Sequence, residues 1–252
     1  MNTYKKIDDI FDNFQKNTER VKELLRIDKL MQDIYIRALE SVERRITDAD
    51  FIKTHPLLKP LQSGIANLKT IRKHESSSSY YEIVYNQSVV LLVSYFESTL
   101  EDLFTNILFI KISDGTLNYP TNKIIKLNLK QLCELITNHE KIPEVWLSQN
   151  EINFQNINNV ESTFKDYFGI SSCEDKHIDN VKMGVICRHI IVHSGEIISP
   201  SNVESVGKTI HRDIMKNFTA GDKIRFEPEE ITKICESMEI YINNIVKQIK
   251  VV

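Results

Sequence analysis

Residues 187–195 place one arginine and two histidines in an otherwise apolar run: Cys187-Arg188-His189-Ile190-Ile191-Val192-His193-Ser194-Gly195. Burying these polar groups among branched aliphatic side chains costs free energy unless they are paired or used in chemistry. Arginine carries a permanent planar charge whose five N–H donors suit a phosphate. Histidine titrates near neutral pH and can act as a general acid or base. The segment therefore combines the groups needed to bind a phosphate and to transfer protons beside it.

A predicted helix over residues 175–193 must position these groups, and Gly195 follows it where a glycine C-cap is expected. This helix has apolar residues on nearly all sides, so we expect it to be covered on nearly all sides. Arg188 and His193 are about 140° apart around the helix axis. They flank the face that carries Val185 and Val192, and the length of the arginine allows the two tips to converge over it.

The Val185/Val192 face is also suited to self-association, because it is apolar. If it packs against a second copy around a two-fold axis, two Arg/His pairs enter one cleft.

The local charge agrees with a phosphate-containing ligand: residues 182–216 hold five Lys or Arg against three acidic residues. This basic excess is adequate for a few phosphate contacts.

The spacing Arg188-x4-His193, at the end of an apolar helix and followed by Ser194-Gly195, resembles the Arg-x4-6-His motif of the HEPN superfamily (higher eukaryote and prokaryote nucleotide-binding domains). A long apolar helix that carries Tyr95-Phe96-Glu97 is similar to the first core helix of that fold. His189 stands where a polar residue is common in these proteins, and the turn Gly221-Asp222-Lys223-Ile224 before a last amphipathic helix is similar too. The resemblance covers roughly residues 80–250.

This resemblance implies a metal-independent endoribonuclease that leaves 2′,3′-cyclic phosphate ends and works as a homodimer with a composite active site. It implies that His193 acts as general acid or base on the ribose 2′-OH and that Arg188 stabilises charge on the phosphate. His189, Glu97 and Ser194 would support them. The expected partners are RNA, a second copy and an antitoxin or regulatory protein, in a toxin–antitoxin or anti-phage role. We expect no cofactor and no metal.

Two other interpretations of the motif stay open. In a purely structural one, a buried Arg188 pairs with Glu97 or Glu101, and His193 caps the helix. A different class of function is a non-catalytic HEPN-like module that binds RNA, a nucleotide or a protein through the same cleft. RNA binding without a cyclic-phosphate product would distinguish this module from the enzyme.

A zinc site is a further alternative, because His189 and His193 lie one turn apart on one helical face. Ile190, however, stands where a zinc peptidase carries a glutamate. Only Glu196 or His211 offers a third ligand.

Composition predicts a globular helical protein. Hydrophobic residues make up 41% and charged residues 27% of 252 residues, and only 7 glycines and 6 prolines occur, which argues against disorder and against many-stranded β architectures. The net charge of −3 gives no general attraction to nucleic acid or membrane. Scattered cysteines, a polar N-terminus and the lack of a long apolar run predict a cytoplasmic protein with free thiols, no signal peptide and no membrane contact.

Apolar periodicity predicts helices over residues 4–47, 65–72, 81–112, 127–136, 160–168, 175–193 and 202–217, and a final one that starts at Glu227-Pro228. The asparagine-rich residues 150–159 predict loops, Trp146 is expected to anchor a loop, and residues 223–226 are expected to be extended. The predicted fold is all-α: an irregular, HEPN-like helical bundle over residues 76–252 with a helical extension over residues 1–75. One short β-hairpin near the C-terminus completes the prediction.

Overall fold

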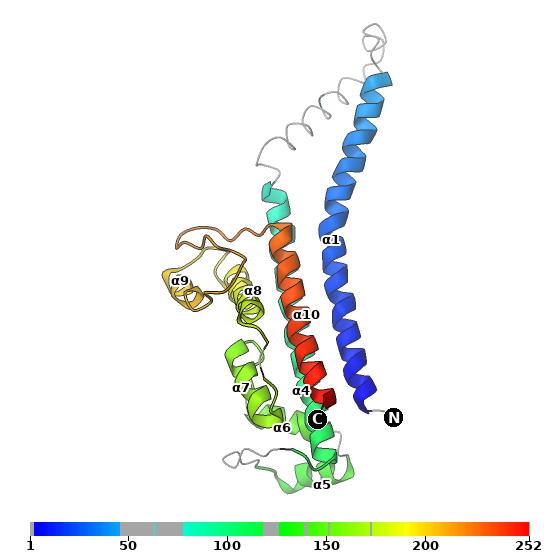
Figure 1. The fold of residues 1–252 in the computed structure, drawn as a ribbon, viewed down its shortest axis with the longest axis vertical. Helices are drawn as coiled ribbons and strands as arrows, with labels where there is room; N and C mark the ends of the chain where they lie inside the picture. Colours follow the sequence, from blue (N-terminus) through cyan, green and yellow to red (C-terminus); the bar gives the residue numbers. More distant parts are fainter. Residues whose placement is uncertain are drawn as a thin grey trace.

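The computed structural model describes residues 3–45, 63, 78–117, 126–138, 141–150, 152–171 and 173–251. Every regular element among them is an α-helix, and the helices form an irregular bundle around one hydrophobic core (Figure 1). The all-α prediction is therefore confirmed. The predicted helix over residues 65–72 and the boundary between residues 75 and 76 lie outside the described residues. No helix of the described chain is both long and apolar enough to cross a membrane.

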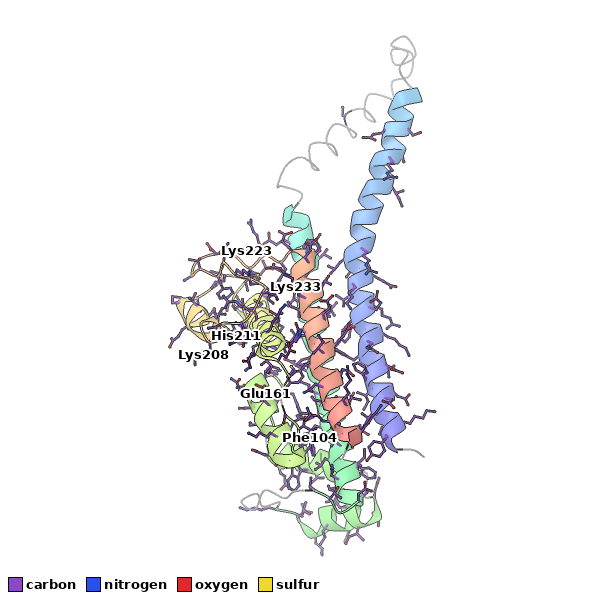
Figure 2. All side chains as sticks on the ribbon, in the orientation of Figure 1. Phe104, Glu161, Lys208, His211, Lys223 and Lys233 are labelled. Atoms are coloured by element: carbon purple, nitrogen blue, oxygen red, sulfur yellow. The ribbon has the colours of Figure 1, made fainter. Side chains whose placement is uncertain are left out.

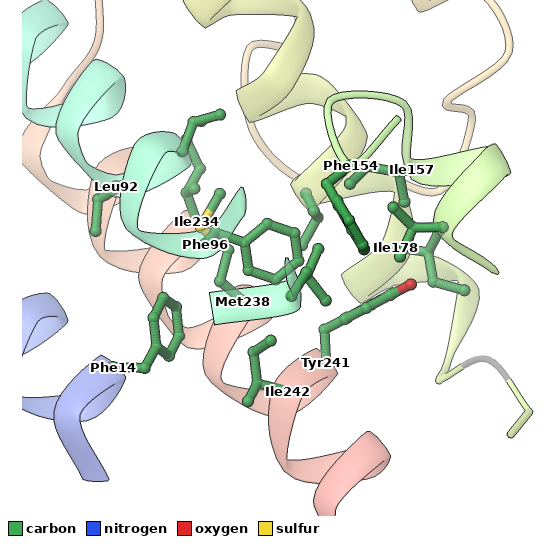
Figure 3. Packing of buried hydrophobic residues seen from close by; sticks show 14 of the residues in the cluster. Phe14, Leu92, Phe96, Phe154, Ile157, Ile178, Ile234, Met238, Tyr241 and Ile242 are labelled. Atoms are coloured by element: carbon green, nitrogen blue, oxygen red, sulfur yellow. The ribbon is translucent and has the colours of Figure 1, made fainter. Parts of the chain in front are cut away.

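Three long helices form the body of the bundle: α1 (Thr3–Arg45), α4 (Ser78–Ser113) and α10 (Pro228–Val251). Phe96 of α4 is fully buried where they meet, with its ring centroid 6.2 Å from that of Phe14 on α1 and 5.5 Å from that of Tyr241 on α10 (Figure 3). Thr18 and Lys22 of α1 both donate to one carboxylate oxygen of α10, that of Glu239. The first half of α1 thus belongs to the common core, whereas its second half extends past the other helices (Figure 1).

Helix α8 (Asp175–His193) packs against both α4 and α10 and has the predicted boundaries. Its contact with α10 is close because Gly184 lies at the crossing. A Cβ atom on Gly184 would come within 3.3 Å of Cγ2 of Ile234. Even an alanine there would make a tighter contact than usual with the Ile234 side chain, so the glycine favours close packing of α8 on α10.

A cluster of aromatic rings joins α4 to α6 (Ile142–Asn150) and α7 (Ile157–Phe168) at the other end of the molecule. Helix α5 (Leu129–Thr137) precedes them in the chain and contributes no ring. Phe104 of α4, in the lower half of Figure 2, lies with its ring centroid 5.1–5.8 Å from those of four other rings: Phe154, Phe164, Tyr167 and Phe168. Two local predictions were wrong here. Trp146 lies in helix α6 rather than in a loop, and Asn158 and Asn159 belong to the first turn of α7, where the side chain of Asn156 accepts from their N–H groups.

The predicted helix over residues 202–217 is much shorter in the structure, where α9 spans only Pro200–Val206. The chain beyond it is held by side chains of distant helices. The N–H of Asp213 donates to Asn180 of α8 at 3.1 Å, and the N–H of Met215 donates to Glu230 of α10 at 2.7 Å. Backbone donors satisfied in this way do not need the carbonyls of a preceding turn, so no helix forms.

The predicted β-hairpin is not formed in the described chain. Residues 223–226 are non-helical, as expected, but they pair with a distant segment through one isolated antiparallel bridge, between Ile197 and Lys223. Backbone hydrogen bonds join Ile198 to Asp222 and Ile224 to Glu196. This pairing ties the chain that leaves α8 to the chain that enters α10.

Replacing Phe104 by alanine is expected to lower the free energy of unfolding by about 3–5 kcal/mol, because the fully buried ring leaves a cavity among four others. Urea denaturation measures the loss. The control is Leu129→Ala on α5, where the side chain is 77% exposed and the expected change is below about 0.5 kcal/mol. Equal losses in the two variants would contradict this account of the core.

Candidate active site at the end of helix α8

The last three turns of α8 have one buried and one open side. Cys187, Ile190 and Ile191 face the core, whereas His189, Val192 and His193 are exposed. The prediction that α8 is covered on nearly all sides is therefore wrong for this half of the helix, as far as the described residues extend. The uncovered side is the face predicted to carry the chemistry.

Arg188 lies at the edge of this open side, in a pocket of about 400 Å³ that is also lined by His189 and by Glu97 of α4. Nε of Arg188 and Oε1 of Glu97 are both buried and have no hydrogen-bond partner in the described part of the chain. Burial raises the pKa of Glu97 above its ordinary value, and the charge of Arg188 opposes this rise without cancelling it. A cation and a carboxylate thus line the same pocket, and each has one buried polar atom without a partner in the described chain.

His193 lies beside the pocket rather than in its lining. Its exposed ring lies against that of His189 in a tilted arrangement, with 4.7 Å between the ring centroids and 47° between the ring planes. The structure thus brings Arg188, His189 and Glu97 together in one pocket, and His193 joins them through His189. Ser194 is exposed and caps the helix, with its N–H donating to the carbonyl of Ile190 at 2.9 Å.

Four lining residues were not identified from the sequence: Asn153, Gln155, Asn202 and Ser205. Asn153 and Gln155 flank Phe154, whose buried ring has its centroid 5.8 Å from that of Phe104, so packing of the aromatic residue holds this part of the backbone at the pocket. Asn202 belongs to the capping box of α9, where its Oδ1 accepts from the N–H of Ser199. The polar–apolar–polar order of residues 153–155 was the one signal that could have identified the first pair.

The turn after His193 has an unusual backbone. Gly195 and Glu196 both have left-handed φ values, of 58° and 68°. For a glutamate this conformation costs about 1–3 kcal/mol. It is held because the Glu196 carboxylate accepts from Lys223 at 2.8 Å and from Asn86 at 2.9 Å. Lys223 (labelled in Figure 2) also pairs with Glu82, which is only 6% exposed, so the end of α8 is bound to the start of α4.

The third ligands considered for a zinc site are used elsewhere. Glu196 pairs with Lys223, and His211 pairs with Asp179 at 3.3 Å. The described residues contain no group of three or more His, Cys, Asp or Glu that could hold a metal ion. All four cysteines are free thiols.

No protein-family model, curated protein or solved structure matches this chain. The HEPN resemblance therefore depends on the motif residues and on their position at the end of an apolar helix.

Replacing Glu196 by glutamine is expected to lower the free energy of unfolding at pH 7 by about 1–2 kcal/mol, because charge-assisted bonds are lost. Burial opposes ionisation of Glu196, but the bonds from Lys223 and Asn86 outweigh it and lower its pKa. A lowered carboxyl pKa gives stability above the unfolded-state value, near 4.3, that is lost as the pH falls through the folded-state value. Urea denaturation at pH 7 and at acidic pH should show the difference between wild type and variant shrinking with acidity.

The control for this substitution is Glu204→Gln on α9, because Glu204 is exposed and makes no side-chain hydrogen bond or ion pair within the described chain. It should leave the free energy of unfolding unchanged at both pH values. A Glu196→Gln loss that is independent of pH would show that the bonds do not depend on the carboxylate charge.

Proposed function

We propose that this chain is a metal-independent endoribonuclease of the HEPN type. The observation that carries the proposal is an open pocket with a guanidinium whose buried Nε has no partner, next to two exposed imidazoles. An arginine held for structural reasons alone would have its donors satisfied by the protein. Arg188 instead has an Nε without a partner in the described chain, and the residue lines the pocket that a ligand would enter.

The chemistry that fits these groups is attack of a ribose 2′-OH on the adjacent phosphorus. His193 accepts the proton of the 2′-OH, the new O2′–P bond forms, and the P–O5′ bond breaks. The products are a 2′,3′-cyclic phosphate and a 5′-hydroxyl, which takes up one proton from a general acid. His189, whose ring lies against that of His193, can supply that proton. Arg188 stabilises the charge that develops on the non-bridging phosphate oxygens.

The proposal includes a homodimer with a composite site. Val192, which precedes His193 in the chain, is 48% exposed. Val185 lies seven residues, or about two helical turns, earlier on the same face of α8 and is half-buried. Covering this face with a second copy would bury apolar surface and bring two sets of Arg188 and His193 together. By the same resemblance, we propose a cytoplasmic toxin–antitoxin or anti-phage role, with an antitoxin or regulatory protein as a further partner.

A second candidate, the non-catalytic module, is favoured by one observation: His193 does not line the pocket that Arg188 lines. A module that binds RNA, a nucleotide or a protein segment there would need Arg188 and the pocket amides but no proton transfer from His193. The two candidates therefore differ in whether His193 matters.

Purified protein is expected to cleave RNA in the presence of EDTA, and either Arg188→Ala or His193→Ala should reduce the rate by about 10²-fold or more. Gel analysis of a labelled oligoribonucleotide measures the rate. Arg20→Ala, at an exposed arginine of α1, and His211→Ala, at a histidine outside the pocket, are the matched controls. Equal cleavage by the wild type and both site variants would contradict the assignment, and binding that needs only Arg188 would favour the module.

Replacing Val192 by aspartate should convert the proposed dimer to a monomer and abolish cleavage, because a charge placed at the centre of an apolar interface is not solvated there. Sedimentation velocity gives the mass, and circular dichroism confirms that the helices are retained. Ile210→Asp is the control, since that side chain is 73% exposed outside α8. A wild-type protein that is monomeric and fully active would rule out the composite site.

A further inference from the structure

A second cavity, of about 650 Å³, lies where the loop that follows α9 meets the start of α10. It is larger than the pocket beside Arg188 and shares no lining residue with it. Four cationic side chains line it: Lys216 of the loop, Lys223 and Arg225 of the chain that enters α10, and Lys233 of α10 itself. Lys223 and Lys233 are labelled in Figure 2. An anion in this cavity would therefore meet positive charge from several segments of the chain.

Three carboxylates line the same cavity, but two of them already accept hydrogen bonds from the protein. Asp213 accepts from Asn180 at 2.8 Å and pairs with Lys176 at 3.0 Å. The two oxygens of Glu230 each accept from a backbone N–H, at 2.7 and 3.1 Å. The third, Asp222, is exposed, so water and salt screen its charge. Internal donors thus compensate much of the negative charge of the lining.

The cations of the lining are less fully engaged. Lys216 is exposed and makes no hydrogen bond or ion pair within the described chain. Lys233 lies 3.8 Å from the carboxylate of Asp213 and donates to its carbonyl at 3.4 Å, and both contacts are long. Arg225 pairs with Glu82 through Nε at 3.3 Å, whereas a guanidinium has five N–H donors in all. The cavity therefore offers donors with positive charge to a ligand.

The backbone beside Lys216 is held in a strained conformation. Met215 has a left-handed φ of 46°, which side chains other than that of glycine rarely adopt. The bond from its N–H to Glu230 of α10 holds this conformation in place. Strain of this kind persists only where the surrounding structure enforces it, and it is common at ligand sites. Here it holds the backbone that carries Lys216 at the edge of the cavity.

The lining also indicates what kind of anion fits. Among the described residues it contains no aromatic ring, and Ile198 and Met215 are its apolar members, so a nucleotide base finds no ring to stack on. One phosphate is too small to contact cations on three separate segments at once. A chain of phosphates carries several charges close together and presents acceptor oxygens on all sides, which suits ammonium and guanidinium donors.

We propose that this cavity binds a chain of two or more phosphates, either as an inorganic polyphosphate or as the phosphate chain of a nucleotide. The site is separate from the pocket of Arg188, and the inference does not depend on the proposed function. One contact connects the two places: Lys223 also pairs with Glu196, in the turn that follows His193. A bound phosphate chain therefore competes with Glu196 for a cation at the end of α8.

Isothermal titration calorimetry with inorganic triphosphate, in EDTA and at low salt, tests the proposal. The wild type is expected to bind triphosphate about ten-fold or more tightly than inorganic phosphate, because several charged contacts form instead of one. ATP and GTP should bind as tightly as inorganic triphosphate, because the cavity does not recognise the base. Lys216→Ala should weaken triphosphate binding about ten-fold, as expected for one hydrogen bond from a charged group. This variant should fold normally, because Lys216 has no partner in the described chain.

Lys208→Ala is the matched control, because Lys208 is another exposed lysine of the same loop and lies outside the lining (Figure 2). It should bind triphosphate like the wild type, and so should Arg188→Ala, which alters only the other pocket. Unchanged affinity in Lys216→Ala, or equal binding of phosphate and triphosphate, would overturn the inference. Binding of ATP without binding of inorganic triphosphate would overturn it too. Displacement of triphosphate by a single-stranded oligoribonucleotide would instead assign the cavity to RNA and contradict a site for a small ligand.

Discussion

The close packing of α8 against α10 at Gly184 is the constraint on which the rest of the site depends. A Cβ at this position would come within 3.3 Å of the Cγ2 methyl of Ile234, so the absence of a side chain lets Ile234 pack directly on the backbone of α8. On the same helix Cys187 and Ile190 are fully buried, whereas His189, Val192 and His193 are exposed. The direction in which Arg188, His189 and His193 point is thus decided by a core contact several residues away.

Two further contacts complete the site from the outside. The ring of Phe154 packs on Phe104, and this holds the neighbouring amides at the pocket. Beyond α8, the ion pairs of Glu196 with Lys223 and of Lys223 with Glu82 keep a left-handed turn in place. The polar groups are therefore fixed by apolar packing on one side and by partly buried charge pairs on the other. Such preorganisation is what catalysis of phosphoryl transfer requires of a protein.

Prediction from the sequence succeeded where structure is decided locally. Helices α4, α8 and α10 are long and rich in apolar residues, and their extents were predicted to within a few residues. Residues 207–217 were predicted helical because their composition permits it, but Asn180 and Glu230 bind their backbone from helices distant in the sequence. Helix α6 was missed because Pro143 and the nearby asparagines suggested loops, although a proline in the first turn is compatible with a helix.

The site shows the same division. Arg188, His189 and His193 were found because they lie within six residues of one another on one helix. Asn153 and Asn202 come from other elements, and only the tertiary packing brings them to the pocket.

The central claim is that the chain cuts RNA through the ribose 2′-OH. Mass spectrometry of the product ends, obtained in EDTA from an oligoribonucleotide and from the same oligonucleotide with 2′-deoxyribose at the cleaved position, tests it most directly. The account predicts 2′,3′-cyclic phosphate and 5′-hydroxyl ends from the first and no cleavage of the second, whereas 5′-phosphate ends or cleavage at the deoxyribose would contradict it.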